Sequence, residues 1–224
     1  MEHEASPWLL FGMSAFVAVI LALFGILSTR RLEKLPTRRV QSVAEFIVES
    51  LNYFGVGIIG PKGSKYTPFI GSLFLYILMM NLLGLIPMFK SPTSGLSITI
   101  SLALVVFVVY NYAGIREVGF IPYLKHLAGE PVWLAPLMLP IHVIGELARP
   151  LSLSIRLFGN IFGEETVLAI LAGLTFVIIP YVVAIPTQFP MMLFAIFTSF
   201  VQALVFTMLT TIYISVAISS HEGH

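Results

Sequence analysis

The feature that most constrains this chain is a run from Trp8 to Ser28 that carries no charged residue. A helix needs about 20 apolar residues to cross a lipid bilayer, so this run is long enough to span one. Similar runs recur along the chain, and of its 224 residues 58% are hydrophobic and only 10% are charged. Soluble domains have about 25% charged residues. The pattern therefore predicts an all-α integral membrane protein.

The apolar runs and the turn signals between them predict a single membrane domain over residues 1–224. We expect about five membrane helices and one amphipathic helix on the cytoplasmic surface. The last two membrane helices are expected to be long and strongly tilted, and the polar content of the first of these two indicates the tilt. The predicted boundaries, in chain order, are 8–29, 37–59, 67–89, 95–116, 132–175 and 190–219.

The helix predicted at 37–59 differs from the others because it is amphipathic. Its apolar residues recur at alternating steps of four and three from Val40 to Ile58, while Glu45 and Glu49 belong to a polar face. A helix of this type lies in the interface of a bilayer. The alternative, a soluble helix against a core, needs a soluble core that this chain lacks.

Positive charges predict which side of the membrane each connection faces. Cations at 30–34 follow the first apolar run, and Arg116 and Lys125 precede the fifth, whereas the connection at 90–95 has only one cation. Because cytoplasmic connections carry an excess of Lys and Arg, we expect the N-terminus outside and the C-terminus in the cytoplasm. No cleavable secretory signal is visible, so the first run is expected to be retained as a membrane helix.

The composition excludes several kinds of chemistry. Cysteine and aspartate are both absent, which removes disulfides, thiolate sites and most hard-metal chemistry. The net charge of +1 provides no basic surface for nucleic acid. Residues 55–62 nearly match a phosphate-binding loop, but Pro61 occupies the position of its lysine. We therefore expect no nucleotide site, no other cofactor and no metal site, and His221 and His224 fit a solvated tail.

The fifth membrane segment carries a polar stripe along an otherwise apolar helix. At about 100° per residue, six polar side chains fall within an arc of roughly 80°. They are His142, Glu146, Arg149, Arg156, Asn160 and Glu164. The adjoining arc carries small residues, namely Gly145, Ala148, Ser152, Gly159 and Gly163. Since small residues let another helix approach closely, the stripe is expected to face a partner and not lipid.

Arg156 is the charge that this helix does not neutralise by itself. A charged side chain in the centre of a bilayer costs about 2.5–3.5 kcal/mol. Glu146 and Arg149 are three residues apart, so an ion pair is the structural alternative to a functional role for Arg149. For Arg156 the nearest acid on the same face is Glu164, roughly 12 Å along the axis. Because a guanidinium keeps its proton, it would favour ionisation of a carboxylate brought close to it from elsewhere.

The run RPLSLSIRLFGN at 149–160 resembles the signature of ATP synthase subunit a. Residues 81–87 and the loop at 92–93 are similar to the exit of that family's third helix, and the run around Gln202 is similar to its last helix. The resemblance covers nearly the whole chain and is strongest at 141–165.

This resemblance implies the proton-channel subunit in the stator of a rotary F-type ATP synthase of bacterial type. Such a subunit holds two offset aqueous half-channels against a rotating c-ring, in which each c subunit has one membrane carboxylate. The implied partners are the c-ring, the b subunits of the peripheral stalk, the F1 sector indirectly, the lipid bilayer and the transported H+. The implied location is the cell inner (plasma) membrane. Nucleotide chemistry belongs to other subunits, so no phosphoryl-transfer site is expected here.

Matching positions in the family imply roles for individual residues. Arg156 would be the essential arginine that faces the ring carboxylate and blocks a proton short circuit. Asn160 and Gln202 would support it. Glu146 and His142, nearer the cytoplasmic start of the segment, would belong to the inward path.

Glu165 would lie on the outward half-channel, where the chain departs from some of its relatives. Some bacterial members pair this acid with a histidine on the last helix, but the corresponding position here is Ala195. Water together with Glu164, Asn81 or Ser199 would have to replace that histidine.

Two other classes of function remain open. A stand-alone secondary transporter would favour inverted repeats and paired broken helices, and neither is visible. A purely structural scaffold would leave Arg156 dispensable. The residues do not decide between H+ and Na+ as the coupling ion, because in this family that choice depends mainly on the c-ring.

Overall fold

A computed structural model of the chain describes residues 7–29, 39–86, 89–123, 135–178 and 188–219. All regular structure within these ranges is helical, which confirms the predicted all-α fold. The elements are α1 (Pro7–Thr29), α2 (Arg39–Ile59), η1 (Pro61–Lys65), α3 (Thr67–Leu83), η2 (Pro92–Ser94), α4 (Leu96–Val118), α6 (Ala135–Ile178) and α7 (Gln188–Ser219).

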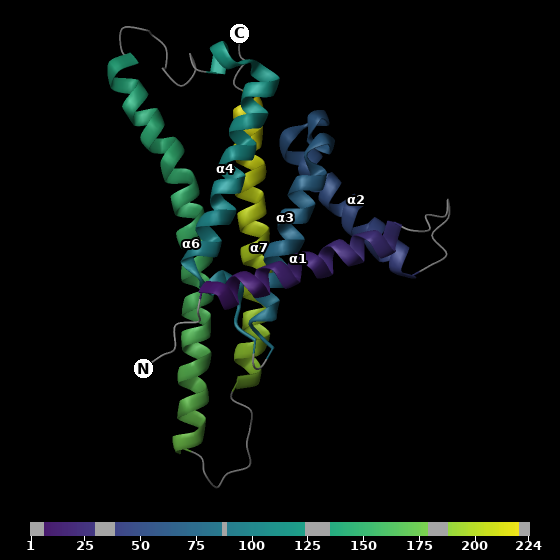
Figure 1. Cartoon of the computed structure of the whole chain (residues 1–224), viewed down its shortest axis with the longest axis vertical. Helices are drawn as coiled ribbons and strands as arrows, with labels where there is room; N and C mark the ends of the chain where they lie inside the picture. Colours follow the sequence, from purple (N-terminus) through teal and green to yellow (C-terminus); the bar gives the residue numbers. More distant parts are fainter. Residues whose placement is uncertain (1–6, 30–38, 87–88, 124–134, 179–187, 220–224) are drawn as a thin grey trace.

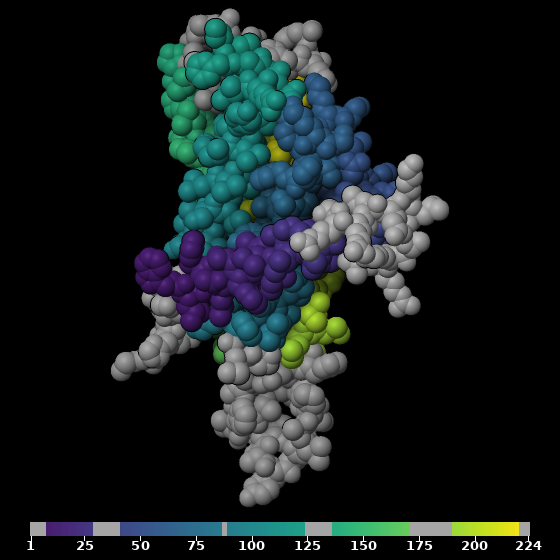
Figure 2. Space-filling model, turned by 45° about the vertical axis from the view of Figure 1, so that its right-hand side comes forward, coloured from purple at the N-terminus to yellow at the C-terminus, as the bar shows by residue number. Residues whose placement is uncertain are grey.

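Four helices form the body of the molecule. α3, α4, α6 and α7 run side by side, with α7 in contact with the other three (Figure 1). α1 crosses this bundle at a steep angle, and α2 projects from it next to α3. The space-filling view shows α1 lying across the outside of the bundle (Figure 2). The bundle is therefore built mainly from the second half of the chain, with α1 and α2 added on one side.

Several helices are suited to a membrane by length and composition. Among the described residues, four long apolar stretches qualify as spans: Trp8–Ser28, Gln41–Ile59, Leu96–Val118 and Pro190–Ser219. α3 is a shorter apolar helix. The chain is thus a multi-pass membrane protein. α2 qualifies although its polar face includes a hydrogen bond of 2.7 Å between Gln41 and Glu45, so its location on the membrane surface stays a prediction.

α6 is far longer than a bilayer is thick. Its 44 residues correspond to about 66 Å at 1.5 Å per residue, against a hydrocarbon core of about 30 Å. Pro140 and Pro150 lie inside the helix without ending it. α1 has 23 residues, about 35 Å, and therefore fits the bilayer when nearly upright. α4 also has 23 residues and runs beside α6, so the strong tilt of α6 stays a prediction.

α3 ends earlier than the end at residue 89 that the sequence analysis expected. The helix stops at Leu83, and the next amides bond three residues back, Gly84 to Asn81 and Leu85 to Leu82. Such bonds belong to a tightened final turn. The sequence explains the stop, because Pro87 follows and the residue before a proline is disfavoured in a helix.

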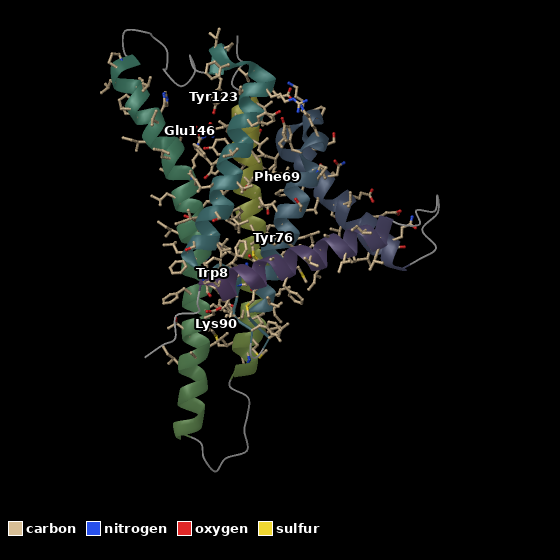
Figure 3. The ribbon with its side chains drawn as sticks, viewed as in Figure 1. Trp8, Phe69, Tyr76, Lys90, Tyr123 and Glu146 are labelled. Atoms are coloured by element: carbon tan, nitrogen blue, oxygen red, sulfur yellow. The ribbon has the colours of Figure 1, made fainter. Side chains whose placement is uncertain are left out.

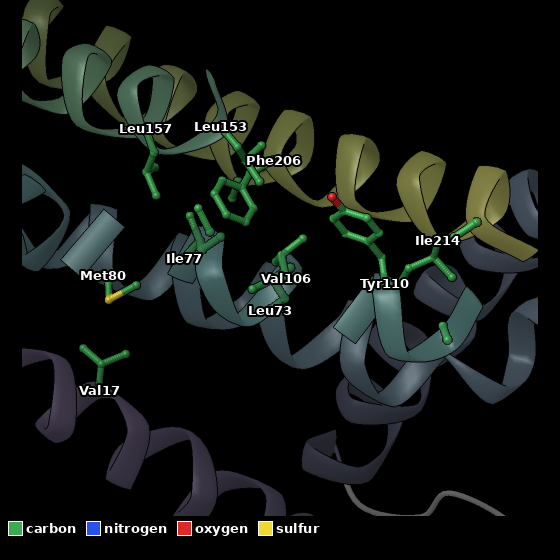
Figure 4. Packing of buried hydrophobic residues seen from close by; sticks show 14 of the residues in the cluster. Val17, Leu73, Ile77, Met80, Val106, Tyr110, Leu153, Leu157, Phe206 and Ile214 are labelled. Carbon is green, nitrogen blue, oxygen red and sulfur yellow. The ribbon is translucent and has the colours of Figure 1, made fainter. Parts of the chain in front are cut away.

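The core lies where the four bundle helices meet (Figure 4). Fully buried side chains come from each helix: Ile77 and Met80 on α3, Val106 and Tyr110 on α4, Leu153 and Leu157 on α6, and Phe206 and Ile214 on α7. The leucines on α6 fix the rotation of that helix about its axis. As a result, its polar stripe lies at the edge of the buried face.

Candidate functional site

Arg156 lies near the middle of α6 with its side chain exposed. Leu153 and Leu157 beside it are 2% and 0% exposed, so the arginine stands at the border of the buried face. Within the described part of the chain, Arg156 makes no ion pair and no hydrogen bond. Its charge is therefore open to a group that approaches from outside this fold.

Asn160, one turn further along α6, connects that helix to α7. Its Nδ2 donates a hydrogen bond of 2.6 Å to Oε1 of Gln202. Gln202 is only 4% exposed, and its Nε2 is buried without a partner in the described structure. The sequence analysis expected both residues to support Arg156, and the structure brings the two together in the seam beside it.

Glu164 also faces α7. The hydroxyl of Thr198 lies 2.6 Å from Oε2 of this glutamate and 3.0 Å from the carbonyl oxygen of Ala195 on its own helix. Ala195, which the resemblance stated above matches to a histidine of some bacterial members, is fully buried. A glutamate and a threonine thus lie beside this position.

Glu165 faces the opposite neighbour of α6, the segment that includes η2. The backbone N–H of Ser91 donates to Oε1 of this glutamate at 3.3 Å. The Ser91 hydroxyl lies 2.6 Å from that of Thr93, and both residues are buried. The carboxylate therefore abuts a small buried group of hydroxyls.

That group continues to α3 and α7. The Thr93 hydroxyl donates to Oδ1 of Asn81 at 2.7 Å, and Nδ2 of Asn81 lies 3.4 Å from the carbonyl oxygen of Ser199. Asn81 is 2% exposed, and the Ser199 hydroxyl is buried without a partner among the described residues. Polar groups thus form a connected path from Glu165 to Ser199.

Glu146 lies toward the other end of α6 in a contact among three helices. Arg149 donates to its Oε1 at 2.5 Å, which confirms the ion pair weighed from the sequence. The hydroxyl of Tyr110 on α4 donates to Oε2 at 2.6 Å. The guanidinium of Arg149 stands over the ring of Tyr213 on α7, 5.3 Å from its centre. His142 is partly buried one turn before Glu146.

Tyr123, beyond the end of α4, borders this contact. Its hydroxyl donates to Oδ1 of Asn111 at 2.8 Å, and Nδ2 of Asn111 donates to the carbonyl of Phe107. Burial and, to a smaller extent, the charge on Glu146 raise the pKa of the Tyr123 phenol. The phenol therefore stays protonated at neutral pH and serves as a hydrogen-bond donor.

The acidic groups thus lie on both sides of Arg156 along α6. At 1.5 Å per residue, Glu146 precedes it by about 15 Å and Glu165 follows it by about 14 Å. Figure 3 shows Glu146 and Tyr123 near one end of the bundle and Lys90, which precedes Ser91, near the other. The chain therefore offers two separate polar regions with a single unpaired cation between them on the described part of α6.

The small residues beside Arg156 are not covered by any described part of the chain. A side-chain carbon built at Gly145, Gly159 or Gly163 meets no atom within 4 Å, and Ala148 and Ser152 are exposed. This part of α6 is therefore a shallow surface that another helix can approach closely.

Several of these residues were not predicted as site residues: Ser91, Thr93, Tyr110, Thr198 and Tyr213. Thr198 is four residues before Gln202 and so shares its face of α7, a signal that the sequence did contain. Tyr110 gave no such signal, because its partner is on another helix. Among the described residues, no group of three metal-ligating side chains lies close enough to hold a metal ion.

Comparisons with known proteins give a consistent result. The profile of the family described as ATP synthase A chain matches residues 11–215. ATP synthase subunit a from Protochlamydia amoebophila is 42% identical over 206 residues, which cover 88% of this chain and 76% of that protein. ATP synthase subunit a 1 from Syntrophotalea carbinolica is 42% identical over 224 residues, covering 100% and 88%. The protein named ATP synthase subunit a from Solidesulfovibrio magneticus is 46% identical over 199 residues, covering 89% and 79%.

Proposed function

Because the chain belongs to the ATP synthase A chain family, we propose that it is the stator subunit that passes protons to and from a rotating c-ring. Membership of the family makes it a subunit of the ATP synthase complex, with a part in proton transport and ATP synthesis. The proposal concerns which residues of this chain carry the protons and how Arg156 prevents them from crossing directly.

The observation that carries the proposal is the exposed guanidinium of Arg156. It is permanently charged, and within the described structure it has no acid of its own. An unpaired charge within a membrane helix is costly, so we propose that another chain supplies the counter-charge. The small-residue surface beside it suits the approach of a helix, and a carboxylate on a c subunit would supply the charge.

Arg156 would act by changing the protonation of the ring carboxylates. A carboxylic acid that arrives protonated is driven to release its proton near a fixed positive charge, because that charge favours the ionised form. The same cation repels a proton that moves along the seam. Protons would therefore move from one polar region to the other only on the ring.

The outward half-channel would be formed by Glu165 and Glu164. Glu165 abuts the buried hydroxyls of the η2 segment, and Asn81 and Ser199 continue that polar path. Glu164, held by Thr198, would replace the histidine that is absent at Ala195. Carboxyl groups and water are suited to such a relay.

The inward half-channel would run past Glu146 and His142. Asn160 and Gln202 would hold α6 and α7 together beside Arg156 through their hydrogen bond. We also propose contacts with the c-ring and the b subunits, and an indirect connection to the F1 sector. The proposed location is the cell inner membrane, with the N-terminus outside and the C-terminus in the cytoplasm.

Replacement of Arg156 tests the central claim. In the assembled complex, Arg156→Gln is expected to abolish ATP synthesis driven by a proton gradient, while assembly measured by co-purification of the ring is retained. Arg116→Gln is the matched control, because Arg116 is an exposed cation in the last turn of α4, and normal synthesis is expected. Normal synthesis in the Arg156 variant would instead support a scaffold, and proton uptake by the chain reconstituted alone would support a transporter.

A further inference from the structure

Side chains from three helices meet around the carboxylate of Glu146. Both oxygens of its carboxylate are occupied, Oε1 by Arg149 and Oε2 by the hydroxyl of Tyr110. The three residues and Tyr213, whose ring lies under the Arg149 guanidinium, come from α4, α6 and α7. We refer to these four residues as the Glu146 cluster.

Tyr110 is the most firmly placed member of the cluster. It is 1% exposed, and its ring packs edge-on against Phe107 with a centre-to-centre distance of 5.5 Å. On the other side it meets the ring of Tyr213 at 5.8 Å. Figure 4 shows it within the buried core, between α4 and α7. Because the ring cannot turn without disturbing this packing, its hydroxyl is a donor at a fixed point.

The side chain of Glu146 is held less firmly by contacts within its own helix than Tyr110 is held by its packing. An acid held only by Arg149, three residues later, could follow the flexible arginine side chain toward either side of α6. The hydrogen bond of 2.6 Å from Tyr110 selects the orientation toward α4. A hydrogen bond from a hydroxyl to a charged oxygen is also stronger than a hydrogen bond between neutral groups.

We propose that Tyr110 is a positioning residue that holds the Glu146 carboxylate in the seam between α4 and α6, where it exchanges protons. The inference rests on the proposed inward role of Glu146. Tyr110 itself transfers no proton in this scheme. Among the described residues, the other titratable or charged groups around Glu146 are His142 and Arg149 on α6, Tyr213 on α7 and Tyr123 after α4.

The test uses the complete complex in inside-out vesicles, with ATP-driven acidification as the readout. Tyr110→Phe removes the hydroxyl and keeps the buried ring, so assembly is expected to be normal. We expect the initial rate of proton pumping to fall by about tenfold or more, the range for loss of one hydrogen bond to a charged group.

Tyr112→Phe is the matched control, because Tyr112 lies on the same helix and is 61% exposed. It is expected to leave the rate unchanged. An unchanged rate in Tyr110→Phe would overturn the proposal. So would an equal loss of rate when Tyr110→Phe is added to Glu146→Gln, since a purely structural role predicts that result.

A second variant separates this inference from the proposed function. Glu146→Gln is expected to slow pumping, and adding Tyr110→Phe to it is expected to cause no further loss, because Tyr110 acts through Glu146. If Glu146→Gln pumps normally, the inward role of Glu146 fails, and the inference fails with it. If Glu146→Gln slows pumping and adding Tyr110→Phe lowers the rate further by the factor seen in the single variant, only the positioning role of Tyr110 is wrong.

Discussion

Asn160 and Gln202 share a hydrogen bond, and replacing one or the other is predicted to lower the stability of the fold by unequal amounts. The bond joins α6 to α7 at 2.6 Å, one turn from Arg156. Gln202 is nearly fully buried and already has one amide nitrogen without a partner, whereas Asn160 is exposed. Asn160→Leu leaves the whole buried amide of Gln202 unpaired. Gln202→Leu removes that amide and leaves Asn160, which is exposed and therefore not buried without a partner.

The expected loss of stability in each variant follows from these differences in burial and pairing. Side-chain hydrogen bonds between membrane helices contribute about 0.6 kcal/mol on average and at most about 1.7 kcal/mol. The short distance and the burial of one partner place this bond in the upper part of that range. We expect Asn160→Leu to destabilise the fold by about 1–2 kcal/mol, since it also leaves a buried group unsatisfied. Gln202→Leu is expected to cost less than about 0.5 kcal/mol, because it removes the unpaired nitrogen as well.

A double-mutant cycle measures the bond itself. The free energy of unfolding would be determined in mixed micelles of increasing denaturing detergent, followed by far-ultraviolet circular dichroism. The double variant is expected to be no less stable than Asn160→Leu alone, with a coupling energy of about 1 kcal/mol. Thr166→Val serves as a control, because its hydroxyl bonds only within α6, to the carbonyl of Phe162. A coupling near zero, or a larger loss for Gln202→Leu than for Asn160→Leu, would refute the reasoning.

Three further predictions concern other parts of the molecule. Glu165→Gln is expected to slow proton uptake from the outer side by about tenfold or more, because a proton-transfer group is lost. Unchanged pumping in inside-out vesicles would contradict its outward role. A Cβ built at Gly159 meets no described atom within 4 Å, so Gly159→Leu should leave stability unchanged while co-purification of the c-ring is lost. Retained ring binding would place the interface elsewhere. Gly63→Ala would bring a new carbon within 2.6 Å of the carbonyl oxygen of Gly55. The free energy of unfolding in detergent is therefore expected to fall by about 1–3 kcal/mol. Gly57→Ala is the neutral control, because a carbon built there meets no described atom within 4 Å.

Sequence reasoning predicted those features that depend on a single helix. The polar stripe of α6 follows from helical periodicity alone, and so does the pair between Glu146 and Arg149, which the structure confirms. The early end of α3 could also have been predicted, because Gly84 and Pro87 both disfavour continuation. Short-range rules are reliable here because the residues involved share one backbone segment.

Contacts between helices could not be predicted in the same way. The partner of Glu146 on α4 is Tyr110, 36 residues away in sequence, and nothing in the local pattern around Tyr110 indicates an acid. The same holds for Ser91, whose contact with Glu165 depends on how the segment that includes η2 packs against α6. Such pairs depend on the rotation and height of each helix, which large buried side chains such as Leu157 and Phe206 determine together.

The length of α6 has a consequence for the proposed function. About 28 Å of helix axis separates Glu146 from Glu165, which in an upright helix would set the two acids near opposite faces of the membrane at almost the same lateral position. If α6 instead lies at the strong tilt that the sequence predicts, most of that separation would be lateral. Under the proposed function, a proton delivered at one acid could then reach the other only on a carrier that moves sideways through the lipid, and a rotating ring would provide such a carrier.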